Sequence, residues 1–511
     1  MSRIRALAPL AVSVLLVSGA VAALRIAAAP RPARVTLDSG TIEGVRDSTS
    51  NVLVFRGVPY AAPPVGSLRW RPPRPVAHWR GVRSASRLGH NCMQAQIYGD
   101  IDPFAAGVSE DCLYLNVWTT GTSGARRPVM VWIHGGGFFA GFGGEERHDG
   151  TRLAQKGAVV VTLNYRLGAF GFLAHPALRA ESPHHAAGNY GLLDQIAALR
   201  WVHRNIARFG GDPARVTIFG ESAGGMSVGA LVASPLAAGL FQRAILESGT
   251  GIGIGVQKRT TADSAGVAFA TALGVAGRGA KAASQLRALS ADSVLAAARA
   301  MSTAHGGAPI FWPVVDGWVL PRPVDSALAK GRGSIVPVIV GSNANEGDAV
   351  FGAPARSFAR LVTAHGGRAY LYQFTRVGDD SASRRRGAYH SAEITFVFGR
   401  LHPLRPEAGS TAYDSTLAEA MSDYWVAFAG SGDPNGPPAA GRRPVWPVYH
   451  PATDAYLELG PTVRAGDALP RAVYDSLDAI GRARGEVRPQ SGAARSDDVA
   501  RPRTPTMRIP R

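Results

Sequence analysis

A Gly-Glu-Ser-Ala-Gly segment at residues 220–224 carries the strongest local signal for chemistry in the chain. It follows an apolar, β-branched run at 215–219 and precedes a run of small residues at 223–233. We therefore expect it at a sharp turn from a buried strand into a helix. Such a turn needs glycine at its flanks and projects the serine hydroxyl, here Ser222, above the sheet as a nucleophile. In a chain with 61 Gly the bare pattern also occurs in ordinary turns, but its position after a strand favours the chemical interpretation.

A second glycine-rich segment, His-Gly-Gly-Gly-Phe at residues 134–138, follows another apolar run at 129–133. Three glycines let the backbone turn tightly and leave N–H groups free to face a negatively charged oxygen. Donors of this kind are what a nucleophilic serine needs, so the two segments support one another. A flexible turn is the weaker alternative, and a phosphate-binding loop is disfavoured because no Gly-Lys-Ser/Thr sequence follows.

A serine nucleophile also needs a base, and the base needs a carboxylate to orient it. In proteins with this type of turn the chain order is Ser, then Asp or Glu, then His. Glu346 lies just past a predicted strand at 336–340, where such an acid belongs, although Asp316 and Asp348 are rivals on spacing alone. The histidines that follow Glu346 are His365, His390, His402 and His450, and spacing does not choose among them.

The body of the chain alternates short apolar strands with helical patterns, which predicts an α/β fold with a mainly parallel sheet covered by helices. The predicted buried strands are 129–133, 159–163, 215–219 and 336–340, and a helix is predicted at 191–209. Residues 264–304 are Ala-rich, helical in pattern and free of strand signals, so we expect a helical cap inserted over the strand ends. No internal repeat or linker divides the body, which indicates one large domain at 30–481.

The 55 Lys plus Arg and 37 Asp plus Glu give a formal net charge of +18, which raises the question of nucleic-acid binding. Residues 1–34 hold five Arg and no acid, and residues 482–511 hold eight Arg against three acids, so each end contributes +5. The 447 residues between carry only +8, and just four of all the basic residues are Lys. This distribution argues against a nucleic-acid partner.

The two ends of the chain differ in composition from the body. Arg3 and Arg5 precede nineteen uncharged residues at 6–24, and small residues suited to cleavage follow, as in a secretory signal. We predict that residues 1–29 are a signal peptide or an uncleaved N-terminal anchor, so that the protein is secreted or periplasmic, with membrane contact only if the segment is retained. Residues 482–511 lack periodicity and read as a disordered basic tail.

Cys92 and Cys112 are the only cysteines in the chain. In an exported protein two cysteines indicate one disulfide, which here would close a loop of about twenty residues; two free buried thiols are the alternative. Two cysteines are too few for a zinc site built on thiolates.

The sequence resembles the type-B carboxylesterase family, which includes bacterial para-nitrobenzyl esterases and animal cholinesterases. The resemblance runs from about residue 35 to 449 and rests on six segments. They are Phe-Arg-Gly-Val-Pro-Tyr-Ala at 55–61, Glu-Asp-Cys-Leu-Tyr-Leu-Asn-Val at 110–117, His-Gly-Gly-Gly-Phe at 134–138, Asn-Tyr-Arg-Leu-Gly at 164–168, Gly-Asn-Tyr-Gly-Leu-Leu-Asp-Gln at 188–195 and Gly-Glu-Ser-Ala-Gly at 220–224.

The resemblance implies an α/β-hydrolase fold and assigns roles to individual residues. Ser222 would be the nucleophile, Glu346 the acid and His390 the base, because His390 stands in what looks like the family's histidine segment at 387–399. The other implied roles are oxyanion donors at Gly136, Gly137 and Ala223, a disulfide between Cys92 and Cys112, and structural ion pairs Arg69–Glu110 and Arg166–Asp194. Ser248 resembles a serine that lies near the acid, although an ordinary turn residue is an equal alternative.

The function implied is hydrolysis of small to medium carboxylic esters through an acyl-enzyme, with a small-molecule ester as partner and with no metal or organic cofactor. An amidase using the same triad and a non-catalytic binding protein of the cholinesterase type are the alternatives. The segment between Cys92 and Cys112 contains no Trp, whereas cholinesterases place a choline-stacking Trp there, so recognition of a quaternary ammonium lacks its usual platform. The acid segment reads Asn345-Glu346 where the family usually has Asp before the Glu, and we expect the role of Glu346 to survive this change.

Overall fold

The computed structural model describes residues 32–96, 106–122, 124–401, 411–436, 443–467 and 474–476. The predicted signal or anchor at 1–29 and the predicted tail at 482–511 lie outside these residues, so the domain boundaries stay predictions. Among the helices described, none is long and apolar enough to cross a membrane.

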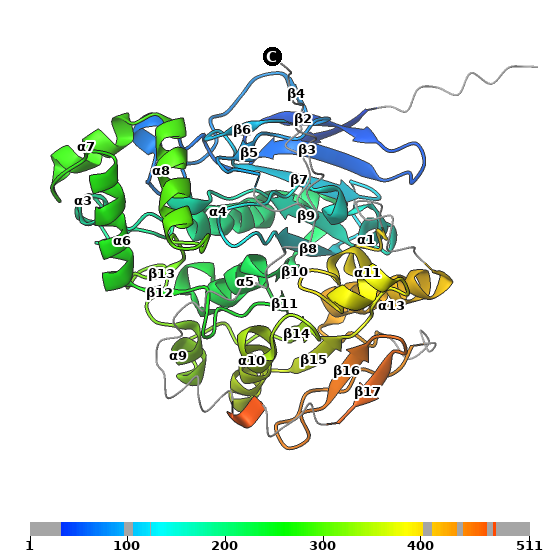
Figure 1. Cartoon of the computed structure of the whole chain (residues 1–511). Coiled ribbons are helices and arrows are strands. Elements are labelled where there is room, and N and C mark those ends of the chain that lie inside the picture. Colours follow the sequence, from blue (N-terminus) through cyan, green and yellow to red (C-terminus); the bar gives the residue numbers. More distant parts are fainter. Residues whose placement is uncertain are drawn as a thin grey trace, which may run out of the picture. The chain divides into compact units, whose positions relative to one another are not determined.

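One large twisted sheet organises the described part of the chain, in the order β1-β2-β3-β7-β9-β8-β10-β11-β14-β15-β16-β17, with β4 paired to β2 (Figure 1). Its strands are β1 (Ala33–Thr36), β2 (Thr41–Arg46), β3 (Leu53–Pro59), β4 (Val82–Ser84), β7 (Tyr114–Thr119), β8 (Arg127–Ile133), β9 (Val159–Leu163), β10 (Gly211–Glu221), β11 (Arg243–Glu247), β14 (Val338–Asn343), β15 (Ala369–Phe374), β16 (Tyr456–Leu459) and β17 (Arg464–Gly466). Two small sheets pair β5 (Asn91–Cys92) with β6 (Val108–Ser109) and β12 (Gln257–Lys258) with β13 (Val314–Val315).

Every neighbouring pair from β9 through β16 is parallel, whereas the pairs at both margins that join β1, β2, β3 and β7, and β16 with β17, are antiparallel. The central strands are apolar on both faces, as parallel strands covered by helices must be. The predicted α/β fold with a mainly parallel sheet is therefore confirmed.

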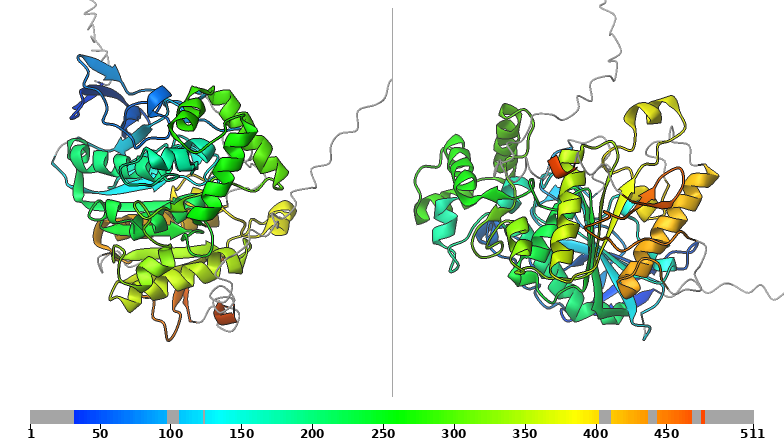
Figure 2. Two further views of the ribbon diagram at one scale, coloured as in Figure 1. Left: turned by 90° about the vertical axis from the view of Figure 1, so that its left-hand side faces the viewer. Right: turned by 90° about the horizontal axis from the view of Figure 1, so that it is seen from below.

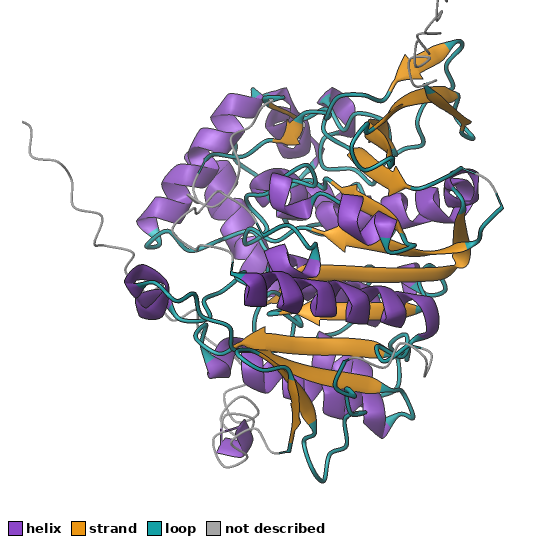
Figure 3. Ribbon diagram, turned by 90° about the vertical axis from the view of Figure 1, so that its right-hand side faces the viewer, coloured by secondary structure: helices purple, strands orange, loops and turns teal. Residues whose placement is uncertain are grey.

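Helices cover both faces of the sheet, as the view from below shows (Figure 2, right). The helices are α1 (Thr151–Gln155), α2 (Gly168–Phe172), α3 (Pro176–Ala180), α4 (Tyr190–Asn205), α5 (Ala223–Ala233), α6 (Arg259–Ala272), α7 (Ala280–Ala288), α8 (Ala291–Ala304), α9 (Val324–Ala329), α10 (Ala353–Ala364), α11 (Ser381–Arg386), α12 (Ile394–Val397) and α13 (Ala412–Ser431). Helices α4, α5 and α10 belong to the larger core, and α12 and α13 pack on the opposite face in a second core rich in aromatic residues. Figure 3 shows these two helical layers against the strands.

The predicted elements agree with the observed ones apart from their ends. The strand predicted at 336–340 starts at Val338 and continues to Asn343, because Pro337 has no N–H for the ladder and residues 341–343 pair with β15. The helix predicted at 191–209 becomes α4 followed by a 3-10 turn, η3 (Ile206–Phe209). The predicted cap at 264–304 consists of three helices, α6, α7 and α8 (Figure 1).

Candidate active site

Ser222 stands at the junction of β10 and α5 with φ 56° and ψ −122°, a conformation that costs a non-glycine residue about 1–3 kcal/mol. The neighbouring glycines make this turn possible. A Cβ on Gly220 would lie 2.5 Å from the Ile133 carbonyl oxygen, and one on Gly224 would lie 2.0 Å from the same atom. The backbone N–H of Ser222 donates to the Glu247 carbonyl at 2.9 Å, which ties the turn to the end of β11. The strand-to-helix turn expected from the sequence is present.

The glycine segment at residues 134–138, which follows β8, lies beside this turn. Gly136 and Gly137 have φ of 95° and 63°, and their N–H groups donate to none of the described residues. The N–H of Ala223 opens helix α5, where an amide has no partner within the helix. These are the donors expected for an oxyanion, and their role stays a prediction. His134 is a structural residue, because burial lowers the pKa of its imidazole to about 4 and the ring stacks on a tyrosine.

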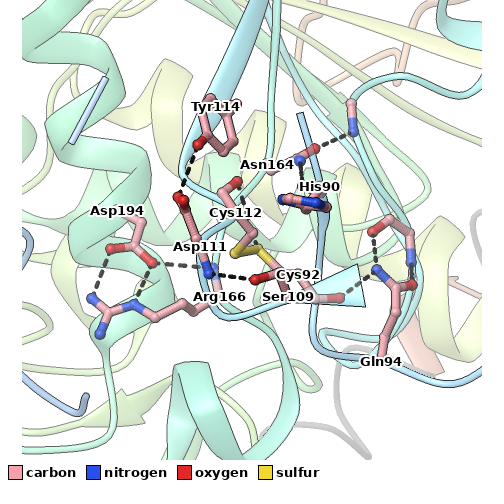
Figure 4. The surroundings of a disulfide bond; sticks show 12 residues. His90, Cys92, Gln94, Ser109, Asp111, Cys112, Tyr114, Asn164, Arg166 and Asp194 are labelled. Atoms are coloured by element: carbon pink, nitrogen blue, oxygen red, sulfur yellow. Dashed lines mark hydrogen bonds and ion pairs between the residues drawn. A yellow bond between two sulfur atoms is a disulfide. The ribbon is translucent and has the colours of Figure 1, made fainter. Parts of the chain in front are cut away.

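Cys92 and Cys112 form the predicted disulfide, which closes the base of their loop (Figure 4). Gln94 connects the base of this loop to Gly141, three residues after the glycine segment, since its Oε1 accepts from the Gly141 N–H at 2.8 Å and its Nε2 donates to the Gly141 carbonyl at 2.9 Å. Asn164 adds a second link by donating to the His90 carbonyl at 3.0 Å.

Among the described histidines that follow Glu346 in the chain, His390 is the one that pairs with it. His390 Nδ1 lies 2.7 Å from Glu346 Oε2, and the other carboxylate oxygen accepts from the Asn343 N–H at 2.7 Å. Asn345 joins the two loops, because its N–H donates to the Ala388 carbonyl at 3.0 Å and its Oδ1 accepts from the Ala388 N–H at 2.8 Å. The Asn that departs from the family pattern thus has its own structural contact.

The His390 side chain is 37% exposed. Phe351, in the π-helical turn η5 (Asp348–Gly352), stacks on the ring at 4.6 Å between centroids. His390 Nε2 lies 3.2 Å from Glu221 Oε1, and no hydrogen bond among the described residues joins His390 to Ser222 Oγ. In substrate-free enzymes such bonds are often long and tighten on binding.

Charge around the imidazole shifts several pKa values. Burial lowers the pKa of His390, but Glu221 and the hydrogen-bonded Glu346 outweigh this effect and raise it to about 10. Burial raises the pKa of Glu221 to about 8 against the opposing influence of His390. The site therefore favours the imidazolium form, which is the form that follows proton abstraction.

The rival candidates take no part in this cluster. Asp316 accepts from the backbone of Trp318 and Leu320 in a turn, and Asp348 accepts from Tyr474. His365 lies near the Ala329 carbonyl, and His450 accepts from a neighbouring N–H, whereas His402 lies outside the described residues.

The two implied ion pairs are formed. Arg69 bonds both oxygens of Glu110, at 2.6 and 2.5 Å, and Arg166 bonds both oxygens of the fully buried Asp194, at 2.8 and 2.7 Å. Ser248 makes no hydrogen bond with Glu346 among the described residues; its Oγ donates instead to Glu393 Oε1 at 3.3 Å.

Sequence reasoning missed three buried acids, Glu221, Glu247 and Glu393. Glu221 and Glu247 each end a buried apolar strand, which is an unusual place for a charge and is a signal that could have revealed them. Glu393 gave no such signal, because it precedes a four-residue helix, and only the fold brings it to Ser248 and Asn343. Within the described residues no group of three or more His, Cys, Asp or Glu has the geometry to hold a metal ion, and the expectation about cofactors stays a prediction.

A nucleophile turn, an adjoining glycine wall and a paired acid and imidazole at one sheet edge are the arrangement of a serine hydrolase. Comparison with known families gives a match to the carboxylesterase family over residues 31–350 and 347–476. The chain belongs to this family. It is a carboxylic ester hydrolase of the α/β-hydrolase fold.

Among its carboxylesterase relatives are the fumonisin B1 esterase of Sphingopyxis macrogoltabida, 37% identical over 84% of this chain and 87% of the relative, and the para-nitrobenzyl esterase of Bacillus subtilis (strain 168), 35% identical over 83% and 94%. A solved structure of a thermophilic PNB esterase superposes with a TM-score of 0.79 at 32% identity and covers 87% of this chain and 99% of its own.

Proposed function

We propose that this carboxylesterase hydrolyses small to medium carboxylic esters by a Ser-His-Glu mechanism with an acyl-enzyme intermediate. Ser222 is the nucleophile, His390 the general base and Glu346 the acid that orients the imidazole. The observation that carries the proposal is the 2.7 Å contact between His390 Nδ1 and Glu346 Oε2, at the edge of the sheet where Ser222 is held in a strained turn.

In the acylation step His390 takes the proton of the Ser222 hydroxyl as its oxygen attacks the ester carbonyl. The tetrahedral oxyanion then receives hydrogen bonds from the N–H groups of Gly136, Gly137 and Ala223. His390 returns the proton to the leaving alcohol, and a water molecule, activated by the same imidazole, releases the acid from Ser222. Glu346 keeps the proton on Nδ1, so that Nε2 is the atom that exchanges protons.

The proposal is tested by measuring hydrolysis of p-nitrophenyl esters of increasing acyl length by the wild type and by Ser222→Ala. We expect turnover to fall by about 10⁴-fold or more in the variant at every chain length. Ser415→Ala, on the exposed surface of α13, is the matched control and should keep wild-type rates. Undiminished turnover in Ser222→Ala contradicts the mechanism.

We infer that the acyl preference depends on the aromatic residues beside the glycine segment. Trp312 packs against Phe138 at 5.8 Å between ring centroids, and its neighbour Phe311 packs edge-on against Phe269 in the core. We infer that Trp312 lines the acyl side and that Phe311 is a core residue. Trp312→Ala should then change the ranking of acyl lengths, whereas loss of rate at all lengths alike would argue against this role.

The relative named fumonisin B1 esterase makes fumonisin B1 a reasonable ester to test on this chain. An amidase using the same triad is the second candidate function, and p-nitroanilides that match the best p-nitrophenyl esters distinguish it. We further propose that the protein is exported, on the evidence of the charged and apolar segment at 1–24. Fractionation of expressing cells and N-terminal sequencing of the product test export and cleavage.

A further inference from the structure

A row of side chains crosses the carboxyl ends of four parallel strands directly behind the candidate active site. Strand register makes Glu221 the neighbour of Glu247, Glu247 the neighbour of Gly341, and Gly341 the neighbour of Tyr372. Neighbours in register point to the same face of a sheet, about 4.8 Å apart. Glu221, Glu247 and Tyr372 therefore project on one side, and all three side chains are buried.

The gap at Gly341 lets the tyrosine ring lean along this row. A Cβ on Gly341 would lie 2.3–2.5 Å from atoms of the Tyr372 ring, so no other residue leaves room for it. Trp425 of α13 covers the row, with its ring 5.7 Å from that of Tyr372 and its Nε1 donating to Glu247 Oε1 at 2.8 Å. The row is closed off by an aromatic layer.

Glu393 and Glu247 differ in the number of hydrogen-bond donors that surround their carboxyl groups. Glu393 Oε2 accepts from Asn343 Nδ2 at 2.5 Å and its Oε1 from Ser248 Oγ at 3.3 Å, so both of its oxygens have a donor. Glu247 has only Trp425, and its Oε2 has no hydrogen-bond partner among the described residues. The Tyr372 hydroxyl is likewise buried and without a hydrogen-bond partner there.

A carboxylate in such a place needs several donors or a cation, whereas a carboxylic acid needs one donor at its carbonyl oxygen and offers its own proton at the other. The titratable groups facing Glu247 from the surrounding elements are Glu221 on β10, Glu393 before α12 and Tyr372 on β15, and no cation of the described residues acts on its carboxyl group. Burial, reinforced by Glu393, raises the pKa of Glu247 well above its usual range. The few hydrogen-bond donors around Glu247 and the acidic groups beside it therefore both favour its neutral form.

We propose that Glu247 is a positioning residue of the esterase, held as a neutral carboxylic acid in the row of Glu221, Glu247 and Tyr372 behind His390. The backbone of Glu247 already holds the N–H of Ser222, so the residue supports the nucleophile from its main chain and the base from its side chain. Without its proton, a further negative charge beside Glu221 and Glu393 would stabilise the imidazolium and stop His390 from acting as a base.

The direct test is infrared difference spectroscopy of the resting full-length protein near neutral pH, wild type minus Glu247→Gln. We expect the difference spectrum to contain the C=O stretch of a protonated carboxylic acid. The control is Glu110→Gln, which removes a carboxylate that is ion-paired with Arg69 and should remove no such band. If Glu247→Gln removes only carboxylate bands, the acid is ionised and the proposal is overturned.

The kinetic test uses the pH profile of kcat/KM on a p-nitrophenyl ester. Glu247→Gln keeps the acceptor for Trp425 and a donor in place of the acid proton, so we expect rates within about threefold of wild type and an unchanged acid limb. A limb shifted to lower pH by about half a unit or more means that a negative charge was removed, which contradicts a neutral Glu247.

Glu247→Ala removes the buried carboxyl group and the acceptor of Trp425, and we expect kcat to fall about tenfold or more with KM unchanged, a loss that Gln rescues. Equal rates for the Ala and Gln variants overturn the positioning role. If the Ala variant does not fold, Trp425→Phe takes its place. It removes the donor to Glu247 Oε1 and should shift the C=O band, and an unmoved band contradicts a neutral Glu247. The kinetic arm rests on the proposed triad, which Ser222→Ala tests separately, whereas the infrared arm needs no turnover.

Discussion

His390 Nε2 lies 3.2 Å from the carboxyl group of Glu221, the residue that immediately precedes the proposed nucleophile Ser222. The imidazole thus stands between two acids, with Glu346 at Nδ1 and Glu221 at Nε2. In the proposed mechanism the ring nitrogen that accepts the serine proton is therefore the one beside Glu221, and we expect this arrangement to govern how the enzyme responds to pH.

The acid limb of kcat/KM should lie above the pKa of an ordinary histidine, because Glu221 and Glu346 raise the pKa of His390 and the base must be neutral to act. Glu221→Gln removes one of these charges, so the limb should move to lower pH by about one unit. Glu419→Gln, which removes a half-exposed carboxylate from α13, is the control and should leave the limb in place. A limb that does not respond to Glu221→Gln would show that Glu221 carries no charge in the free enzyme.

The free energy of unfolding should fall as pH rises from about 5 to about 9. Burial raises the pKa of Glu393 to about 7, and although burial lowers the pKa of His390, Glu221 and Glu346 raise it overall. Groups with raised pKa values hold protons in the folded state that the unfolded chain has lost, so their contribution is complete below the unfolded pKa and disappears as pH passes the folded one. Each such proton adds a slope of about −1.4 kcal/mol per pH unit. Urea unfolding across this range measures the slope, and Glu393→Gln should flatten it.

Gly136→Ala should lower kcat by about 10²–10³-fold, because the backbone that aims the oxyanion donors would have to move. Gly136 has φ 95°, and a Cβ there would lie 2.2 Å from the Ala140 carbonyl oxygen. Gly121→Ala is the matched control, since a Cβ at Gly121 meets nothing closer than 3.6 Å. Single-turnover kinetics would separate loss of chemistry from loss of binding, and a KM effect alone would argue against an oxyanion role.

Removal of the disulfide by Cys92→Ser with Cys112→Ser should cost about 3 kcal/mol, because the bond closes a loop of 20 residues. The free energy of unfolding, measured in urea with and without reductant, tests this. The wild type should respond to reductant and the double variant should not. Activity should fall as well, since Gln94, at the base of this loop, holds Gly141, which follows the glycine segment by three residues.

Arg166→Met should destabilise the fold by about 3–5 kcal/mol, because it leaves Asp194 buried without its counter-ion. The contrasting variant is Arg126→Ala. The Arg126 side chain is 76% exposed in its pair with Asp212, so its removal should lower the free energy of unfolding by less than about 1 kcal/mol. Equal losses in the two variants would contradict the importance of burial for the inner pair.

The chemistry that depends on local sequence could be predicted without a structure. The turn at Ser222 and the glycine wall at residues 134–138 are each specified by glycines next to an apolar strand, and short-range sterics alone require those residues. The α/β class followed from the alternation of strand and helix patterns. The choice of His390 among four histidines needed the resemblance to known esterases, because 44 residues separate it from Glu346 and spacing carries no information over that distance.

Tertiary structure alone determines which buried acids lie side by side behind the active site. Glu221, Glu247 and Tyr372 are distant in the chain and become neighbours only through the register of β10, β11, β14 and β15. Register between parallel strands is set by the packing of the helices that connect and cover them, a property of the whole core that no short segment encodes. The sequence by itself thus determined which residues can do the chemistry, whereas the folded sheet decided which charges surround them.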